Sequence, residues 1–241
     1  QVLSDQDKRQ RYDKYGFDED GNFNSDGGAN SMFALVRALF GAGAFDDYFA
    51  TPFGNMEIDE NDSEVTEEMK AEYQKAMLDN IEQLKSSLLK RLDGIVAAGM
   101  LTDPRKRAPL FDEARMMAEA PGGGELLALL GYAYEQIANK YSKSFFGIPA
   151  WFTRRNEQLH LISSAVSLLG SAASLAASQQ SASEEEVAKR GLKAVWKMGK
   201  LEIDMTVRKV CEEVLEKKDV KPDVKDARVK ALKALGEVFT Q

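Results

Sequence analysis

Cysteine and histidine are nearly absent from this chain of 241 residues, which contains one of each, Cys211 and His160. A single thiol excludes an internal disulfide framework and fits a reducing compartment, and we predict that Cys211 is a small buried residue of a helix. A structural zinc site needs four Cys or His ligands, more than the sequence has, so no metal ligands are predicted. His160 precedes Ser163 and Ser164 within one predicted helix, where a serine is closed to attack, so no hydrolase triad is predicted.

Phosphate-binding and acid/base motifs are missing as well. The glycines before Glu125 are not followed by the Lys and Ser/Thr of a phosphate-binding loop, and they indicate a break between helices. The acidic run at residues 184–186 is explained as a helix start, because Ser183 and Glu186 can form a capping box. We therefore predict no catalytic residue, no cofactor and no enzymatic activity. The net charge of −7 argues against nucleic acid as a partner, because phosphate contacts need a basic surface.

Segments with strand periodicity are also absent, and helical spacing runs from residue 31 onward with short joints marked by Gly and Pro. Two short apolar helices are predicted at residues 31–41 and 43–50. A helix over about residues 63–98 is predicted to bury one face, formed by Met69, Tyr73, Met77, Ile81, Leu84, Leu88, Leu92 and Ile95. Further helices are predicted on either side of the PGGG break at residues 121–124. The predicted fold class is all-α, a multi-helix bundle.

Charged side chains are missing from residues 158–183, a length that suits a membrane span. At roughly 100° per residue, however, five serines fall on one arc of a helix, and large apolar residues such as Leu161, Leu168 and Leu175 lie outside it. These serines are Ser163, Ser167, Ser171, Ser174 and Ser178. This pattern favours an amphipathic helix packed against protein, with membrane insertion as the alternative.

A basic stripe is present on one predicted helix of this acidic protein. In KRGLKAVWKMGK the basic side chains project into one arc of about 100°. This candidate basic interaction face consists of Lys189, Arg190, Lys193, Lys197 and Lys200. Such a face can meet anionic lipid headgroups or an acidic partner, and a merely solvated face is the alternative.

The densest aromatic patch of the sequence is FFGIPAWF at residues 145–152. Its apolar side chains form either a hydrophobic lock between two helices or a contact surface for client proteins. The residues concerned are Phe145, Phe146, Ile148, Trp151 and Phe152.

The opening stretch VLSDQDKRQRYDKYG resembles the last helix of a J-domain. The chain begins without Met, and its charged first helix is too short to be stable without tertiary contacts, so we expect it to end a domain. Its Leu-Ser-Asp, Lys-Arg and Tyr-Asp elements lie at Leu3, Asp5, Lys8, Arg9, Tyr12 and Asp13. We expect a J-domain end at residues 1–16, a flexible linker rich in Asp, Asn and Gly at residues 17–30, and a helical domain at residues 31–241.

The helical domain is similar to the X-domain that follows the J-domain in one group of DnaJ-family co-chaperones. The matching stretches are FGAGAFDDYFA, ELLALLGYAYEQIANKY, FFGIPAWF, GLKAVWKMGKLEIDMTVRKVCEEVL and RVKALKALGEVF, in the family's order. The resemblance implies a co-chaperone whose J-domain docks on a DnaK-type heat-shock chaperone and stimulates ATP hydrolysis. The family's His-Pro-Asp loop, which carries that stimulation, has no counterpart in this sequence.

The resemblance further implies that this region binds client proteins or directs location, in protein folding or in delivery to organelles. The expected partners are client proteins and, through the J-domain, a DnaK-type chaperone. The expected location is the cytoplasm, with an organelle surface as an alternative. Two other functions stay open, namely a structural or anchoring subunit of a larger assembly and peripheral attachment to an anionic membrane through the basic stripe.

Overall fold

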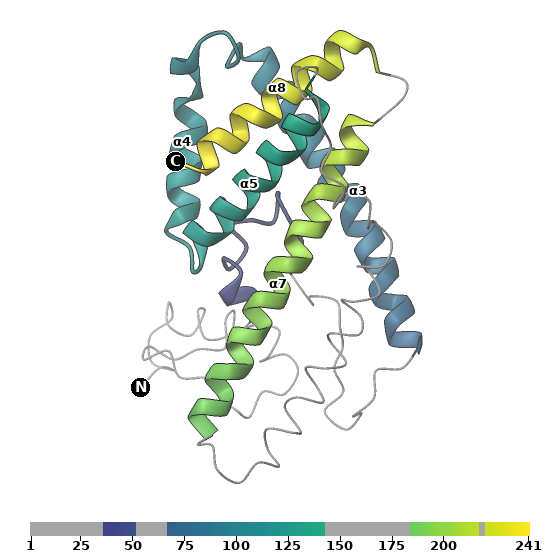
Figure 1. Ribbon diagram of the computed structural model, residues 1–241, viewed down its shortest axis with the longest axis vertical. Helices are drawn as coiled ribbons and strands as arrows, with labels where there is room; N and C mark the ends of the chain where they lie inside the picture. The colour runs from purple at the N-terminus through teal and green to yellow at the C-terminus, as the bar shows by residue number, and fades with distance from the viewer. Residues whose placement is uncertain (1–35, 52–66, 143–183, 217–219) are drawn as a thin grey trace, which may run out of the picture.

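The computed structural model describes residues 36–51, 67–142, 184–216 and 220–241 (Figure 1). Every regular element in these ranges is a helix, so the all-α prediction is confirmed. The elements are α3 Glu67–Ala97, the 3₁₀ helix η3 Pro104–Arg107, α4 Ala108–Ala118, α5 Gly123–Tyr141, α7 Glu184–Leu215 and α8 Pro222–Phe239.

α3 buries the face that its three- and four-residue spacing predicts. Within the described side chains, Met77 packs partly buried against the core, and the buried residues are Ile81, Leu84, Leu88, Leu92 and Ile95. The helix ends in a Schellman motif, because Gly99 adopts a φ of 68°. The Met100 N–H donates to the Ile95 carbonyl at 3.2 Å, and the Gly99 N–H donates to the Val96 carbonyl at 3.0 Å.

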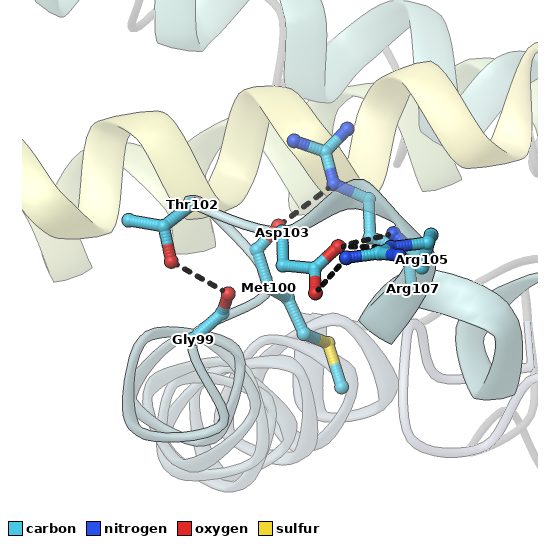
Figure 2. A network of polar contacts seen from close by, with 6 residues as sticks. All are labelled: Gly99, Met100, Thr102, Asp103, Arg105 and Arg107. Atoms are coloured by element: carbon cyan, nitrogen blue, oxygen red, sulfur yellow. Dashed lines mark hydrogen bonds and ion pairs between the residues drawn. The ribbon is translucent and has the colours of Figure 1, made fainter.

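The joint between α3 and η3 is held by short-range polar contacts (Figure 2). The Thr102 hydroxyl donates to the Gly99 carbonyl at 3.0 Å. The Asp103 side chain caps η3 by accepting from the Arg105 N–H at 3.1 Å, and Pro104 follows as the first residue of η3. η3 therefore begins directly after the Asp103 cap. Beyond η3 the chain continues directly into α4.

α5 is the central helix of the described part and packs against α4, α7 and α8. The predicted break is present, but the helix starts inside PGGG, at Gly123, rather than after it, because Gly122 adopts the left-handed conformation at φ 68° and ends the preceding turn. Its buried residues follow helical spacing on a wide face: Leu126, Leu127, Leu130, Ala133, Tyr134, Ile137 and Ala138.

Two glycines allow α5 and α8 to pack closely, and the two helices run side by side in opposite directions in Figure 1. A Cβ atom at Gly131 would lie 2.9 Å from the Gly236 carbonyl oxygen and 3.1 Å from the Phe239 Cβ. A Cβ atom at Gly236 would lie 3.0 Å from the Gly131 carbonyl oxygen. Side-chain atoms of Thr240 and Glu135 also lie within 3 Å of these Cβ positions. Because the other obstructing atoms belong to backbone and Cβ positions, a larger residue would force the helices apart.

The predicted short helix at residues 43–50 is wrong. Residues 40–48 form successive turns, and only residues 36–39 of the segment predicted as 31–41 are described as helical. Gly41, Ala42 and Gly43 all have positive φ, which a right-handed helix cannot contain. The turns nevertheless bury the aromatic side chains Phe45 and Phe49, which stack with ring centroids 5.3 Å apart.

A partly buried polar network joins this segment to α3 and α4. The Tyr48 hydroxyl donates to Glu113 at 2.8 Å, and the Arg91 guanidinium pairs with the other oxygen of Glu113 at 2.7 Å. Arg91 also lies over the Tyr48 ring, 4.5 Å from its centroid. Burial of the phenol raises the pKa of Tyr48, so it remains a hydrogen-bond donor at all physiological pH values.

We predict that Gly131→Ala lowers the free energy of unfolding by about 1–3 kcal/mol, because the added methyl group overpacks the crossing of α5 and α8. Gly94→Ala in α3 is the matched control, since a Cβ atom there meets nothing within 4 Å. It should be neutral or stabilising by up to about 1 kcal/mol, as expected from helix propensity. Urea unfolding followed by circular dichroism measures both, and equal midpoints for the two variants would contradict the close crossing.

Candidate functional site

α7 divides into a packed half and a projecting half. Its 32 residues span about 48 Å, and the carboxy-terminal half is buried against the other helices through Ile203, Val207, Val210, Cys211, Val214 and Leu215. The amino-terminal half extends beyond α4, α5 and α8 (Figure 1). Four residues of the basic stripe predicted from the sequence lie in this half, and Lys200 lies at the start of the packed half.

The residues of the predicted basic face differ in their exposure and in their contacts. Arg190, Lys193 and Lys197 are exposed, and Lys200 is partly covered. Lys189 lies in α7, but its side chain is outside the described part. Among the described residues no carboxylate pairs with Lys193 or Lys197. Of the described side chains of the stripe, these two ammonium groups are therefore open to a partner.

Lys200 is occupied by a contact with α5. Its Nζ lies 2.6 Å from Glu125 and 5.2 Å from the centroid of the Trp196 ring, while the Trp196 indole N–H donates to the same carboxylate at 3.2 Å. The hydrogen bond from Lys200, with a smaller contribution from Trp196, lowers the pKa of Glu125. Lys200 thus attaches α7 to the first turn of α5 and adds no net charge to the exposed surface.

The Trp196 ring also packs on the segment that precedes α3. It stacks on Phe40 with ring centroids 4.8 Å apart. Gly199 makes room for this pair, because a Cβ atom there would lie 2.1 Å from the Phe40 ring. Glu125, Trp196 and Phe40 together therefore fix the angle at which the projecting half of α7 leaves the bundle.

Two exposed apolar side chains continue the surface beyond Lys197. Leu201 on α7 and Tyr132 on α5 each retain 52% exposure. The Arg208 guanidinium lies 5.8 Å from the centroid of the Tyr132 ring and is held by Asp204 at 2.8 Å. Arg208 is two helical turns beyond Leu201 on the same side of α7, so Tyr132 and Leu201 flank one stretch of surface.

We call this surface the α7 face and define it as Arg190, Lys193, Lys197, Leu201 and Tyr132. Leu201 and Tyr132 were not predicted from the sequence. Leu201 could have been found, because at 100° per residue it falls just beyond the edge of the arc of the basic stripe, next to Arg190 and four residues after Lys197. Tyr132 could not, because its place beside Arg208 depends on how α5 packs against α7.

Other candidates from the sequence have a structural role or lie elsewhere. Cys211 is fully buried, as predicted, and burial raises the pKa of its thiol, so it is poorly suited to nucleophilic chemistry. The cavity beside it, lined by Tyr48, Arg91 and Tyr134, measures about 10 Å³ and holds one water at most. The J-domain residues, the serine-rich segment and the aromatic patch at 145–152 are outside the described residues.

A metal site and a membrane-crossing helix are both absent from the described ranges. No group of three or more His, Cys, Asp or Glu side chains in these ranges is placed to hold a metal ion. None of the helices described there combines the length and apolar character that crossing a membrane requires.

We predict that Trp196 fluorescence reports the protonation of Glu125 once Trp151→Phe leaves Trp196 as the sole tryptophan. Because the pKa of Glu125 is lowered, its contacts persist above the ordinary glutamate value of about 4.3 and are lost only as the pH falls below it. Emission should be constant down to about pH 5 and change at lower pH. Glu125→Gln should abolish this transition, and Asp112→Asn, in an exposed pair on α4, should retain it. A transition that survives Glu125→Gln while helicity stays constant would contradict the contact.

Comparison with known proteins assigns the family. The family described as "X-domain of DnaJ-containing" (DnaJ-X) matches residues 77–241. The chain is 29% identical, over 277 aligned residues, to an uncharacterized J domain-containing protein of Schizosaccharomyces pombe, and the alignment covers 99% of this chain and 77% of that protein. No solved structure matches the chain. The family match begins at residue 77, so the predicted domain start at residue 31 stays a prediction. Because the match spans more than half of the chain, this protein belongs to the DnaJ X-domain family.

Proposed function

We propose that this chain is the client-binding or targeting region of a DnaJ-type co-chaperone that works with a DnaK-type heat-shock chaperone. The observation that carries the proposal is the DnaJ X-domain match over residues 77–241. The similarity of nearly the whole chain to a J domain-containing protein supports it. The processes served are protein folding or the delivery of proteins to organelles, in the cytoplasm or at an organelle surface.

The described surface suits binding better than chemistry. The buried thiol of Cys211 and the cavity of about 10 Å³ beside it are closed to a substrate. The α7 face, in contrast, presents two lysines, a leucine and a tyrosine to solvent. Tyr and Arg side chains next to apolar surface are common at protein interfaces, and Arg208 with Tyr132 forms such a pair.

The proposal includes the domain division expected from the sequence. Residues 1–16 end a J-domain, residues 17–30 link it to the helical region, and the DnaK-type chaperone docks on the J-domain. The contact of Phe40 with Trp196 supports this division, because it holds the segment that follows the linker against α7 and so fixes where the helical region begins.

The test compares full-length protein with a variant that lacks residues 67–241. Two quantities are measured: single-turnover ATP hydrolysis by a DnaK-type chaperone, and binding of a permanently unfolded reporter protein by fluorescence anisotropy. We expect the deletion to retain stimulation of ATP hydrolysis and to lose reporter binding. Unchanged reporter binding would refute the client-binding role. Failure of the full-length protein to stimulate hydrolysis, together with its elution in a large complex, would favour an assembly subunit instead.

A further inference from the structure

We infer that the α7 face binds a short acidic segment of another protein, one that also carries an apolar side chain. The inference rests on the proposed client-binding function and names the chemistry of the bound segment. Three properties of the face support the inference: the position of its unpaired lysines, the position of its exposed apolar side chains, and the carboxylates that lie near them.

The open positive charge of the face is confined to one end. Lys200 is paired with Glu125, and Arg208 is held by Asp204. Lys193 and Lys197 are exposed, lie on the projecting half of α7 and have no carboxylate partner among the described residues. On a chain of net charge −7, this is a local positive patch that favours carboxylates of a partner.

The apolar area lies directly beyond the open lysines. Leu201 follows Lys197 by one helical turn, and Tyr132 lies beside the next part of α7, next to Arg208. Burial of a leucine against a partner stabilises a complex more than an exposed charge pair does. The apolar contact therefore supplies affinity, and the lysines supply preference for an acidic partner.

The geometry of α7 sets the spacing of the bound segment. Lys193 and Leu201 are eight residues apart, which corresponds to about 12 Å along the helix. An extended segment covers this distance in about four residues. Lys197 is four residues from Leu201, about 6 Å along the helix, which an extended segment covers in about two residues. The bound segment should therefore carry acidic side chains about two and about four residues from its apolar one.

An anionic membrane fits the same face less well. Stable electrostatic attachment to such a surface needs a cluster of several basic residues, so the two open lysines give weak attachment. Glu125 pairs with Lys200, the sequence neighbour of Leu201, and Asp204 pairs with Arg208, which lies near the Tyr132 ring. Both carboxylates would therefore approach the anionic headgroup layer together with the apolar side chains. A peptide can instead place its acidic groups opposite Lys193 and Lys197 alone.

The experiment measures anisotropy of labelled peptides mixed with the full-length protein. Three peptides share one apolar pattern and differ only in carrying Glu, Gln or Lys at the charged positions. The protein variants are Lys193→Gln with Lys197→Gln, and Leu201→Gln. The matched control is Lys230→Gln with Lys233→Gln, which removes the same charge from exposed positions on α8. Circular dichroism and melting temperature confirm that all variants are folded.

We expect the Glu peptide to bind best, to weaken as salt rises from about 0.05 to about 0.2 M, and to lose about tenfold in affinity with either α7 variant. The α8 control should differ from the unchanged protein by less than about twofold. Equal binding of the Glu and Lys peptides, or binding unaffected by both α7 variants, would overturn the inference.

Two further outcomes separate the possible failures. If the unfolded reporter binds but no peptide does, the client-binding function stands and the acidic preference is refuted. If neither reporter nor peptide binds, the proposed function itself fails. Sedimentation with phosphatidylserine vesicles covers the remaining case, because binding to vesicles alone, lost in the two-lysine variant, would make the α7 face a membrane site and overturn the inference.

Discussion

Gly131 and Gly236 lie face to face where α5 packs on α8, and their lack of side chains sets the distance between the two helices. The contact is reinforced near the carboxy-terminal end of α8, since the Thr240 hydroxyl donates to Glu135 of α5 at 2.9 Å. At the same end of α8, the Arg107 guanidinium of η3 pairs with Glu237 at 3.3 Å. α5 is thereby fixed against α8. Because α5 also carries Glu125 and Tyr132, the same constraint positions both polar and apolar parts of the α7 face.

The projecting half of α7 depends on a second set of contacts, which come from a distant part of the sequence. Phe40 stacks on Trp196, and Tyr48 bonds to Glu113 in the network that includes Arg91. The segment at residues 36–51 is therefore bound to α3, α4 and α7 at once. In the proposed domain arrangement this segment follows the linker from the J-domain, so the position of α7 and the path of the linker are physically connected.

The fold was predictable from the sequence wherever the residues of a single helix determine which of its faces is buried. The spacing of Ile81, Leu84 and Leu88 identified the buried face of α3, and the single cysteine, Cys211, was correctly predicted to be a buried residue of a helix. Residues 43–50 were predicted incorrectly because their apolar spacing is helical, while the positive φ at Gly41, Ala42 and Gly43 directs the chain into turns. Helical periodicity contains no information about backbone conformation at the preceding glycines.

The candidate site was predictable only in part, for a similar reason. The arc of basic residues on α7 follows from its own sequence, and so does the inclusion of Leu201. The pairing of Lys200 with Glu125, 75 positions apart, depends on the packing of α5 and α7, as does the contact of Tyr132 with Arg208. Packing between helices therefore decided which of the predicted cations remain open to a partner.

Hydrogen–deuterium exchange of the full-length protein, with and without a bound unfolded client, tests most directly whether the α7 face is the binding surface of a rigid helical scaffold. The account predicts that client binding slows exchange at residues 190–204 and around residue 132, while α8 exchanges at the same rate in both states. Slowed exchange confined to α4 or α8, with no change on the projecting half of α7, would contradict it.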